Sequence, residues 1–408
     1  MKYGLIGKKI GYSYSKDIHD LSFNCDYQIM SLNEDEVYSI LDKKDFNGLN
    51  ITIPYKKIVV DKCKYKDNIV KEIGVCNTIA NKNGILKAYN TDYYGFLSLL
   101  KFYRIDTNLK NVMILGSGST SSTIFKVLKD QNAKNITIIS RSKYPSYKDI
   151  KELGKDIDII INATPYGTFP NNKKRSLVNR NYFKKDIIAI DVIFNPYRSV
   201  FLMQFNSHYN GLYMLVAQAI KAESYFANIQ CNFKKINDIY YKILLKKINI
   251  VLIGMPGSGK TSIGKKLAKS LNKQFIDTDL LIENNNKLTC KEIIEGYGIK
   301  HFRKEEEKVI CSLNSCRGYI ISTGGGIILN KNNMHYLKEN GIIIYLKRSL
   351  NKLDISSSRP LSNNSKKLKE LYQNRKNLYI QYSDIIINNN NTMKEVCDLI
   401  IKKLNSYR

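Results

Sequence analysis

The sequence has no tryptophan, only four histidines and no long apolar run. No stretch reaches the roughly 18 apolar residues of a membrane span. The first residues, MKYGLIGKKIGYS, lack the apolar segment of a secretory leader. We therefore expect a cytoplasmic protein with no membrane partner. The missing tryptophan, beside abundant Lys, Asn, Ile and Tyr, indicates a coding sequence biased toward A and T.

Paired cysteine motifs are missing as well. The histidines are scattered, and the cysteines form no CxxC pair; they lie at positions 25, 63, 76, 231, 290, 311, 316 and 397. Structural zinc sites and disulfide frameworks are both recognised by regular spacings of such residues. The sequence therefore predicts reduced thiols, without a zinc site or a disulfide framework.

Acidic residues are scarce: 36 Asp and Glu stand against 65 Lys and Arg, which gives a net charge of +29. Such an excess can indicate a nucleic-acid-binding protein. The lysine pairs, however, are spread from Lys8-Lys9 to Lys402-Lys403, and no basic helix or strip with interleaved aromatic residues stands out. We expect no nucleic-acid partner and a generally basic surface, which favours anionic ligands.

The length of 408 residues suggests two or three domains, at about 100 to 200 residues each. Short apolar runs alternate with helix-period segments, which is typical of a parallel βαβ sheet; the runs lie at 111–116, 135–140, 158–162 and 187–192. Earlier runs, joined through a hairpin signal at Asn83-Gly84, indicate a separate α/β lobe. We predict an α/β chain in four parts: a first lobe (1–103), a dinucleotide-binding domain (104–210), closing helices (211–246) and a phosphate-loop domain (247–408).

A glycine-rich turn, GSGSTSS at 116–122, lies between a strand-like and a helix-like segment. Gly116 and Gly118, followed by Ser119, can bring backbone N–H groups and a helix N-terminus to a pyrophosphate. The next strand ends in Ser140-Arg141, without the acid that usually meets the ribose of NAD. This favours NADP, with Arg141 at its 2′-phosphate, although Arg141 could also be an ordinary exposed arginine.

A second glycine-rich turn, GMPGSGKT at 254–261, matches the phosphate-loop pattern GxxxxGK[ST] and follows the strand-like run INIVLIG. In such a loop, backbone N–H groups cradle the phosphates of ATP, the lysine reaches the β and γ phosphates, and the hydroxyl group binds Mg²⁺. The nucleotide is assigned to Gly257, Ser258, Gly259, Lys260, Thr261 and Ser262, with Thr261 also a metal ligand.

The first lobe carries four polar motifs: Ser13-x-Ser15, Asn50 to Lys56, Asn77-Thr78 and Asn90 to Asp92. Singly, each can be a polar loop or a helix cap. In this order, and with matching stretches at 162–167, 191–196 and 211–219, they resemble shikimate dehydrogenase over residues 3 to about 230.

This resemblance implies a Rossmann domain for NADPH and a catalytic pair, Lys56 and Asp92. Lys56 would protonate the alkoxide that forms when hydride reaches the 3-carbonyl of 3-dehydroshikimate. The residues expected around shikimate are Ser13, Ser15, Thr52, Asn77, Asp92 and Gln218.

Another set of motifs follows the phosphate loop: Asp277-Thr-Asp279, Phe302-Arg303-x-x-Glu306, GGG at 324–326, Arg359-Pro-Leu, and Arg375 with Tyr379. Their order and spacing resemble shikimate kinase across residues 248–408. If the run QFIDTD is extended to its end, Asp277 and Asp279 point to one face.

The kinase resemblance implies a role for each of these residues. Asp277 would bind Mg²⁺, Asp279 the substrate hydroxyls, and Arg303 and Arg375 the substrate carboxylate. Glu306 would hold Arg303, Gly325 and Gly326 would approach the substrate, and Arg359 would reach the transferring phosphoryl group from a lid.

The sequence thus predicts a bifunctional enzyme that reduces 3-dehydroshikimate with NADPH and phosphorylates shikimate with ATP. One alternative is a quinate or NAD-preferring dehydrogenase joined to a kinase for another small metabolite. The other is a basic nucleic-acid-binding ATPase.

Overall fold

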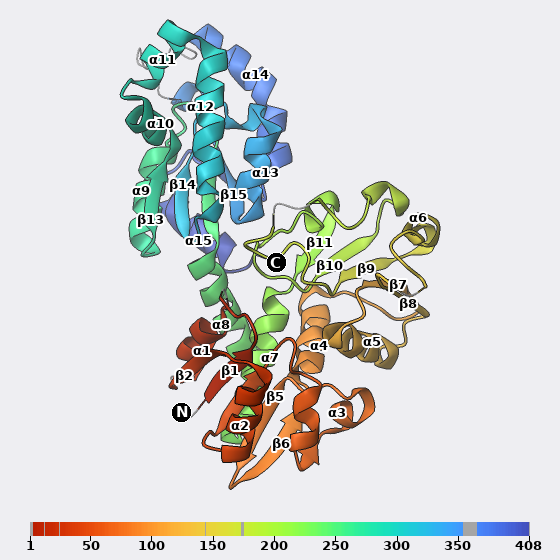
Figure 1. Ribbon diagram of the computed structural model, residues 1–408. Coiled ribbons are helices and arrows are strands. Elements are labelled where there is room, and N and C mark those ends of the chain that lie inside the picture. Colours follow the sequence, from red (N-terminus) through yellow and green to blue (C-terminus); the bar gives the residue numbers. More distant parts are fainter. Residues whose placement is uncertain are drawn as a thin grey trace. The chain divides into compact units, whose positions relative to one another are not determined.

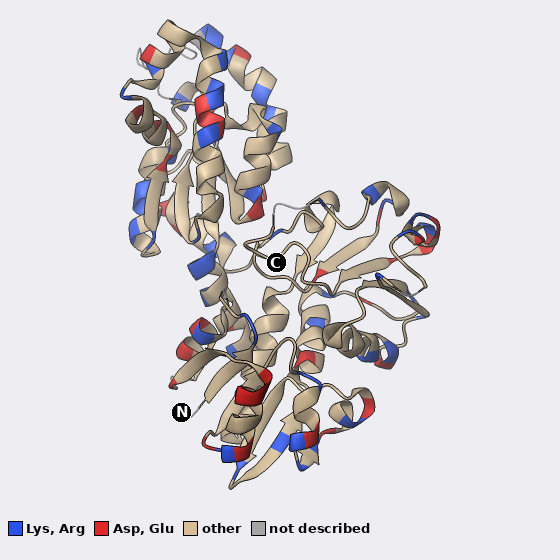
Figure 2. Ribbon diagram, in the orientation of Figure 1, with Lys and Arg blue, Asp and Glu red and all other residues tan. Residues whose placement is uncertain are grey.

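The computed structural model describes residues 3–11, 13–23, 25–142, 144–172, 175–353 and 365–407. The chain divides into two compact units, Met1–Ile243 and Leu244–Arg408, and each is an α/β structure (Figure 1). Lys and Arg are distributed over the helices and strands of both units, with Asp and Glu among them (Figure 2). In the described ranges, no helix has the length and hydrophobicity needed to span a bilayer.

The first lobe of the first unit is a six-stranded mixed sheet. In sheet order its strands are β2 (Tyr27–Ser31), β1 (Tyr3–Gly7), β3 (Gly48–Ile51), β5 (Thr78–Lys82), β6 (Ile85–Tyr89) and β4 (Tyr65–Lys66). β1 runs parallel to β2 and β3, whereas β5 pairs antiparallel with β3 and β6. The predicted hairpin at Asn83-Gly84 is confirmed, with both residues at positive φ. The helices of this lobe are α1 (Ser15–Ser22), α2 (Glu34–Lys43) and α3 (Asn68–Ile73).

The second sheet of this unit is entirely parallel, as the alternating apolar runs predicted. Its order is β11 (Ser207–Asn210), β10 (Ile188–Asp191), β9 (Ile159–Asn162), β7 (Asn111–Leu115) and β8 (Asn135–Ile139). α4 (Thr91–Tyr103) precedes β7 in the chain, whereas α5 (Ser119–Asp130) and α6 (Ile150–Leu153) lie between strands of this sheet. The strand order reverses beside β7, and crevices that bind ligands lie at such reversals in open parallel sheets.

Two helices, α7 (Leu212–Ala227) and α8 (Phe233–Lys247), follow the second sheet. α7 packs closely on α4: a Cβ at Gly95 would lie 2.7 Å from the Met214 carbonyl oxygen. The buried Glu223 of α7 pairs with His19 of α1 at 2.9 Å, accepts a bond from Ser22, and pairs with Lys235 of α8 at 3.1 Å. One carboxylate therefore ties α1, α7 and α8 together.

The second unit is a five-stranded parallel sheet with helices. Its order is β13 (Gln274–Asp277), β14 (Tyr319–Ser322), β12 (Asn249–Ile253), β15 (Gly341–Lys347) and β16 (Ile385–Asn388). The helices are α9 (Lys260–Ser270), α10 (Thr278–Asn286), α11 (Cys290–Tyr297), α12 (Ile299–Ser312), α13 (Lys331–Glu339), α14 (Ser365–Tyr382) and α15 (Met393–Leu404). The central strand β12 leads directly into the phosphate loop, which opens α9. Ile343 of β15 is fully buried in the main core of this unit, whereas Ile386 of β16 is 47% exposed.

These two isoleucines allow a test of the core. Ile343→Ala should lower the free energy of unfolding of the second unit by about 2 to 5 kcal/mol, because it removes buried methyl groups and leaves a cavity. Ile386→Ala, on a neighbouring strand, should change it by less than about 0.5 kcal/mol. Denaturant titration of both variants measures the difference. Equal losses would contradict the assignment of Ile343 to the core.

Candidate active sites

The first site centres on Lys56 and Asp92, the predicted catalytic pair. Lys56 lies in the turn after β3, and Asp92 lies in the first turn of α4, which Asn90 caps by accepting a bond from the Tyr93 N–H. The Lys56 Nζ is 2.6 Å from Asp92 Oδ2, and both residues are buried. Removing either residue would leave the other charge buried without a counterion, which is strongly destabilising.

An amide network surrounds this pair and brings two more predicted residues to it. The Asn77 Nδ2 lies 3.0 Å from Asp92 Oδ1 and 3.3 Å from the Gln218 Oε1 of α7. The Asn77 Oδ1 accepts a bond from the Thr91 N–H at 2.7 Å. Asn77, Asp92, Gln218 and Lys56 are therefore held in one cluster.

Of the remaining predicted contacts, Ser13 lies in the loop after β1, Ser15 is the first residue of α1, and Thr52 directly follows β3. The Ser13 and Ser15 hydroxyls are 3.0 Å apart, and the Thr52 N–H donates to the Ile6 carbonyl. Because β1 and β3 are parallel neighbours, these loops leave the same edge of the sheet. Among the described residues, no hydrogen bond joins these three side chains to the Lys56–Asp92 pair.

The dinucleotide turn leaves β7 at the point where the strand order reverses. Gly116 has φ of +103°, and a Cβ there would lie 2.8 Å from the Thr164 side chain after β9. Gly118 is the N-cap of α5 and Ser119 is its first residue, so no side chain caps the helix. Uncapped N–H groups at a helix N-terminus attract phosphate.

Arg141 lies two residues beyond β8 and is exposed. It is close enough to Tyr147 to act on its pKa, which burial raises and the Arg141 charge lowers. Arg141 thus lies at the end of the strand next to the dinucleotide turn, where the sequence predicts a contact with the 2′-phosphate of NADP.

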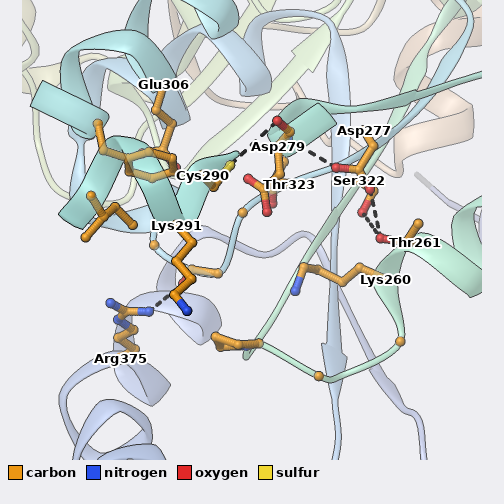
Figure 3. A pocket seen from close by; sticks show the side chains of 18 of the residues that line it. Lys260, Thr261, Asp277, Asp279, Cys290, Lys291, Glu306, Ser322, Thr323 and Arg375 are labelled. Atoms are coloured by element: carbon orange, nitrogen blue, oxygen red, sulfur yellow. Dashed lines mark hydrogen bonds between the residues drawn. The ribbon is translucent and has the colours of Figure 1, made fainter. Parts of the chain in front are cut away.

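The second site is a cavity of about 260 Å³ in the C-terminal unit (Figure 3). The phosphate loop, the start of α10, the helices α11 and α12, the GGG segment and α14 all line it. The predicted residues on its wall are Gly257, Gly259, Lys260, Thr261, Ser262, Asp277, Asp279, Arg303, Glu306, Gly325, Gly326 and Arg375. Ser258 is buried away from it, and its carbonyl accepts a 2.5 Å bond from Asn389. Arg359, the predicted lid arginine, falls outside the described residues.

The phosphate loop places its functional groups side by side. Lys260 Nζ donates to the carbonyls of Gly254 and Met255 at 3.0 and 2.9 Å. The Thr261 hydroxyl lies 2.8 Å from Asp277 Oδ2. A hydroxyl and a carboxylate are oxygen donors of the kind Mg²⁺ prefers, so these two residues fit the expected ion.

Asp277 and Asp279 do not lie on one extended strand. β13 ends at Asp277, which becomes the N-cap of α10 and accepts a bond from the Asp279 N–H at 3.1 Å. Extended geometry through Asp279 is therefore wrong; the helix turn sets their spacing. Burial, and then the nearby Asp277 carboxylate, raise the pKa of Asp279 to about 6, while Lys260 opposes this rise.

The three glycines at 324–326 each touch a functional side chain or the phosphate loop. A Cβ at Gly324 would lie 2.7 Å from Asp279 Oδ1, and one at Gly325 would lie 2.7 Å from Pro256. A Cβ at Gly326 would lie 2.0 Å from the Arg303 Nη2. A side chain at any of these positions would have to displace its neighbour, so glycine allows the main chain to lie this close to the cavity residues.

Two arginines face this wall. Arg303 Nη1 contacts both carboxylate oxygens of Glu306 at 2.8 Å, and Arg375 donates to the Gly325 carbonyl at 3.0 Å. Burial raises the pKa of Glu306, against the effect of Arg303. Burial is also the main reason that the pKa of Arg375 is lowered. The paired guanidinium groups can receive a carboxylate.

Sequence reasoning missed several lining residues. Cys290, Lys291 and Ile294 come from α11, while Ser322 is the last residue of β14 and Thr323 follows it. Ser322 Oγ lies 3.5 Å from the Thr261 hydroxyl. The capping box that fixes α11, Thr289 with Glu292, is readable in the sequence, but it does not indicate which helix face meets a cavity.

Comparison with known proteins assigns both units. A shikimate dehydrogenase (NADP(+)) from Clostridium perfringens is 33% identical over 266 residues, covering 59% of this chain and 97% of that protein. The chain belongs to the shikimate dehydrogenase family. The model of the shikimate dehydrogenase substrate binding domain matches residues 5–79, and the shikimate kinase model matches residues 256–405. A kinase domain therefore follows the dehydrogenase.

Solved structures agree with the dehydrogenase assignment. A chorismate mutase/shikimate 5-dehydrogenase fusion protein from Clostridium acetobutylicum has 30% identity and a TM-score of 0.55, covering 59% of this chain and 96% of that chain. Shikimate dehydrogenase 1 from Peptoclostridium difficile gives the same identity and TM-score, with coverages of 60% and 98%. Both similarities concern the dehydrogenase part of the chain.

The close contact between Gly326 and Arg303 in the kinase domain can be tested by mutation. Gly326→Ala should lower kcat/KM for phosphorylation by up to about 100-fold, because the new methyl group displaces Arg303 and such shifts misplace a bound substrate. Gly296→Ala on α11 is the control, since a Cβ there meets no atom within 4 Å. Steady-state kinetics of both variants test this. An unimpaired Gly326→Ala variant would show that Arg303 need not remain where it lies.

Proposed function

We propose that the chain catalyses two consecutive reactions: NADPH-dependent reduction of 3-dehydroshikimate to shikimate, and ATP-dependent phosphorylation of shikimate to shikimate 3-phosphate. The observation that carries the kinase proposal is the cavity that joins the phosphate loop to Asp279 and two arginines. The buried Lys56–Asp92 pair supports the reductase proposal. Incubation of the purified chain with 3-dehydroshikimate, NADPH, ATP and Mg²⁺ should yield shikimate 3-phosphate.

In the reductase, bound NADPH supplies the hydride that converts the carbonyl to an alcohol. Lys56 donates a proton to the developing alkoxide, and Asp92 orients the lysine side chain through the 2.6 Å contact. Asn77 and Gln218 lie beside the pair and bind substrate hydroxyl groups, while Ser13, Ser15 and Thr52 complete the polar contacts. The amide network leaves few alternative orientations for the pair, which favours a single substrate pose.

In the kinase, bound ATP with Mg²⁺ supplies the phosphoryl group. Lys260 and the N–H groups of the loop would hold the phosphates, while Thr261 and Asp277 would hold the metal ion. Asp279 orients the attacking hydroxyl group, and Arg303 and Arg375 bind the carboxylate at the other end of the substrate. The cavity thus fixes both reactants before transfer, which is the main requirement of phosphoryl-transfer catalysis.

The cofactor preference can be tested at Arg141. Arg141→Asp should weaken NADPH binding by about tenfold or more relative to NADH, because it replaces a cation near the expected 2′-phosphate by an anion. KM values for the two cofactors measure this preference. Lys148→Asp is the control, since it makes the same charge change at an exposed position farther along the chain from the end of β8 than Arg141. Equal weakening of both cofactors would remove Arg141 from this role.

The two activities should be separable. Lys56→Ala should reduce dehydroshikimate reduction by about 10²- to 10⁴-fold, because it removes the proton donor. It should leave phosphorylation of added shikimate intact. Lys260→Ala should show the reverse pattern, with shikimate accumulating and no ADP formed, because the charge at the β and γ phosphates is lost.

The exposed neighbours Lys57 and Lys265 provide matched controls, since neither lies in the predicted sites. Lys57→Ala and Lys265→Ala should retain both activities, and thermal melts should show that all four variants fold. A folded Lys56→Ala or Lys260→Ala variant that loses both reactions would contradict the proposal of independent sites.

A further inference from the structure

The kinase cavity contains a basic residue with no assigned role. Lys291 is the second residue of α11, and its side chain extends into the cavity toward the region of Arg375 (Figure 3). Its backbone position is fixed: Thr289 and Glu292 form a capping box, and the Cys290 N–H donates to Glu283 of α10 at 3.0 Å. The helix that carries Lys291 is thus anchored to the helix that carries Asp279.

Lys291 differs from the other cations of the cavity in its contacts. Arg303 is engaged by both oxygens of Glu306, Arg375 donates to the Gly325 carbonyl, and Lys260 donates to loop carbonyls. No carboxylate of the described residues forms an ion pair with Lys291. Among the cations that line the cavity, Lys291 is the one without a carboxylate or carbonyl acceptor among the described residues, and Figure 3 shows its side chain pointing toward Arg375.

The charge balance of the cavity depends on this residue. Its lining contains four cations, Lys260, Lys291, Arg303 and Arg375, and three carboxylates, Asp277, Asp279 and Glu306. Without Lys291 the numbers are equal. With it, the cavity has one excess positive charge on the side of Arg375, where an acidic substrate would place its carboxylate in the proposed kinase.

We propose that Lys291 binds the carboxylate of the substrate and so selects an acid over an uncharged polyol. The proposal rests on the kinase function proposed above. Arg303 and Arg375 fix the orientation of the carboxylate through planar guanidinium groups, whereas Lys291 adds a mobile point charge from α11. The competing role, contact with the transferred phosphate beside Lys260, predicts an effect on ATP instead.

The test uses the full chain and measures ADP release. NADP(H) is left out, so that the dehydrogenase reaction does not take place. Lys291→Met should raise KM for shikimate by about tenfold, as expected for the loss of a charge-assisted bond. It should leave KM for ATP and kcat within about twofold, because the phosphate loop is unchanged. Lys291→Arg should restore most of the affinity. Lys300→Met, an exposed lysine on α12, is the matched control and should have no effect.

The methyl ester of shikimate separates charge from packing. The ratio of KM between Lys291→Met and the unaltered chain should fall to about one with the ester, because the anion that Lys291 contacts is gone. An unchanged KM for shikimate, an equal penalty on the acid and the ester, or an increase confined to ATP would each overturn the proposal. If the unaltered chain does not phosphorylate shikimate, the kinase function itself fails, and this result is distinct from those three.

Discussion

The buried ion pair between Lys56 and Asp92 constrains two separate elements of the first unit. Both charges are buried, so each needs the other at hydrogen-bond distance, and their positions must be set by separate elements. The turn after β3 supplies the lysine, and the start of α4 supplies the carboxylate. Asn77 donates to Asp92 and lies within hydrogen-bond distance of Gln218. The packing of α7 on α4 therefore places Gln218 beside the amide that contacts the ion pair.

In the second unit, close packing of the main chain helps to position the residues of the cavity. Its cavity wall consists of three glycines pressed against Asp279, Pro256 and Arg303. Close approach of the main chain lets one short segment touch the phosphate loop and both Asp279 and Arg303. The arginines retain partners in Glu306 and the Gly325 carbonyl. Their positions are thus set by the fold, and the ligand does not have to order them.

Much of this arrangement could be predicted from the sequence, because its signals are local. Glycine-rich turns between a strand and a helix, and apolar runs at regular spacing, require only neighbouring residues to be interpreted. The end of β13 could not be predicted from the same pattern, because QFIDTD suits either an extended end or a helix cap, and Asp277 forms a cap. Lys291 was missed for another reason: its role depends on which face of α11 meets the cavity, and tertiary packing decides that.

The Glu223 cluster has a consequence for the autonomy of the dehydrogenase. Its carboxylate holds α1, where Ser15 lies, and α7, where Gln218 lies, while Lys235 of α8 offsets its buried charge. A truncation that stops at the end of α7 would leave this carboxylate without its lysine, although every predicted substrate-binding residue would still be present. A dehydrogenase fragment that keeps this counterion must therefore include at least the first turn of α8, the helix that continues into the second unit.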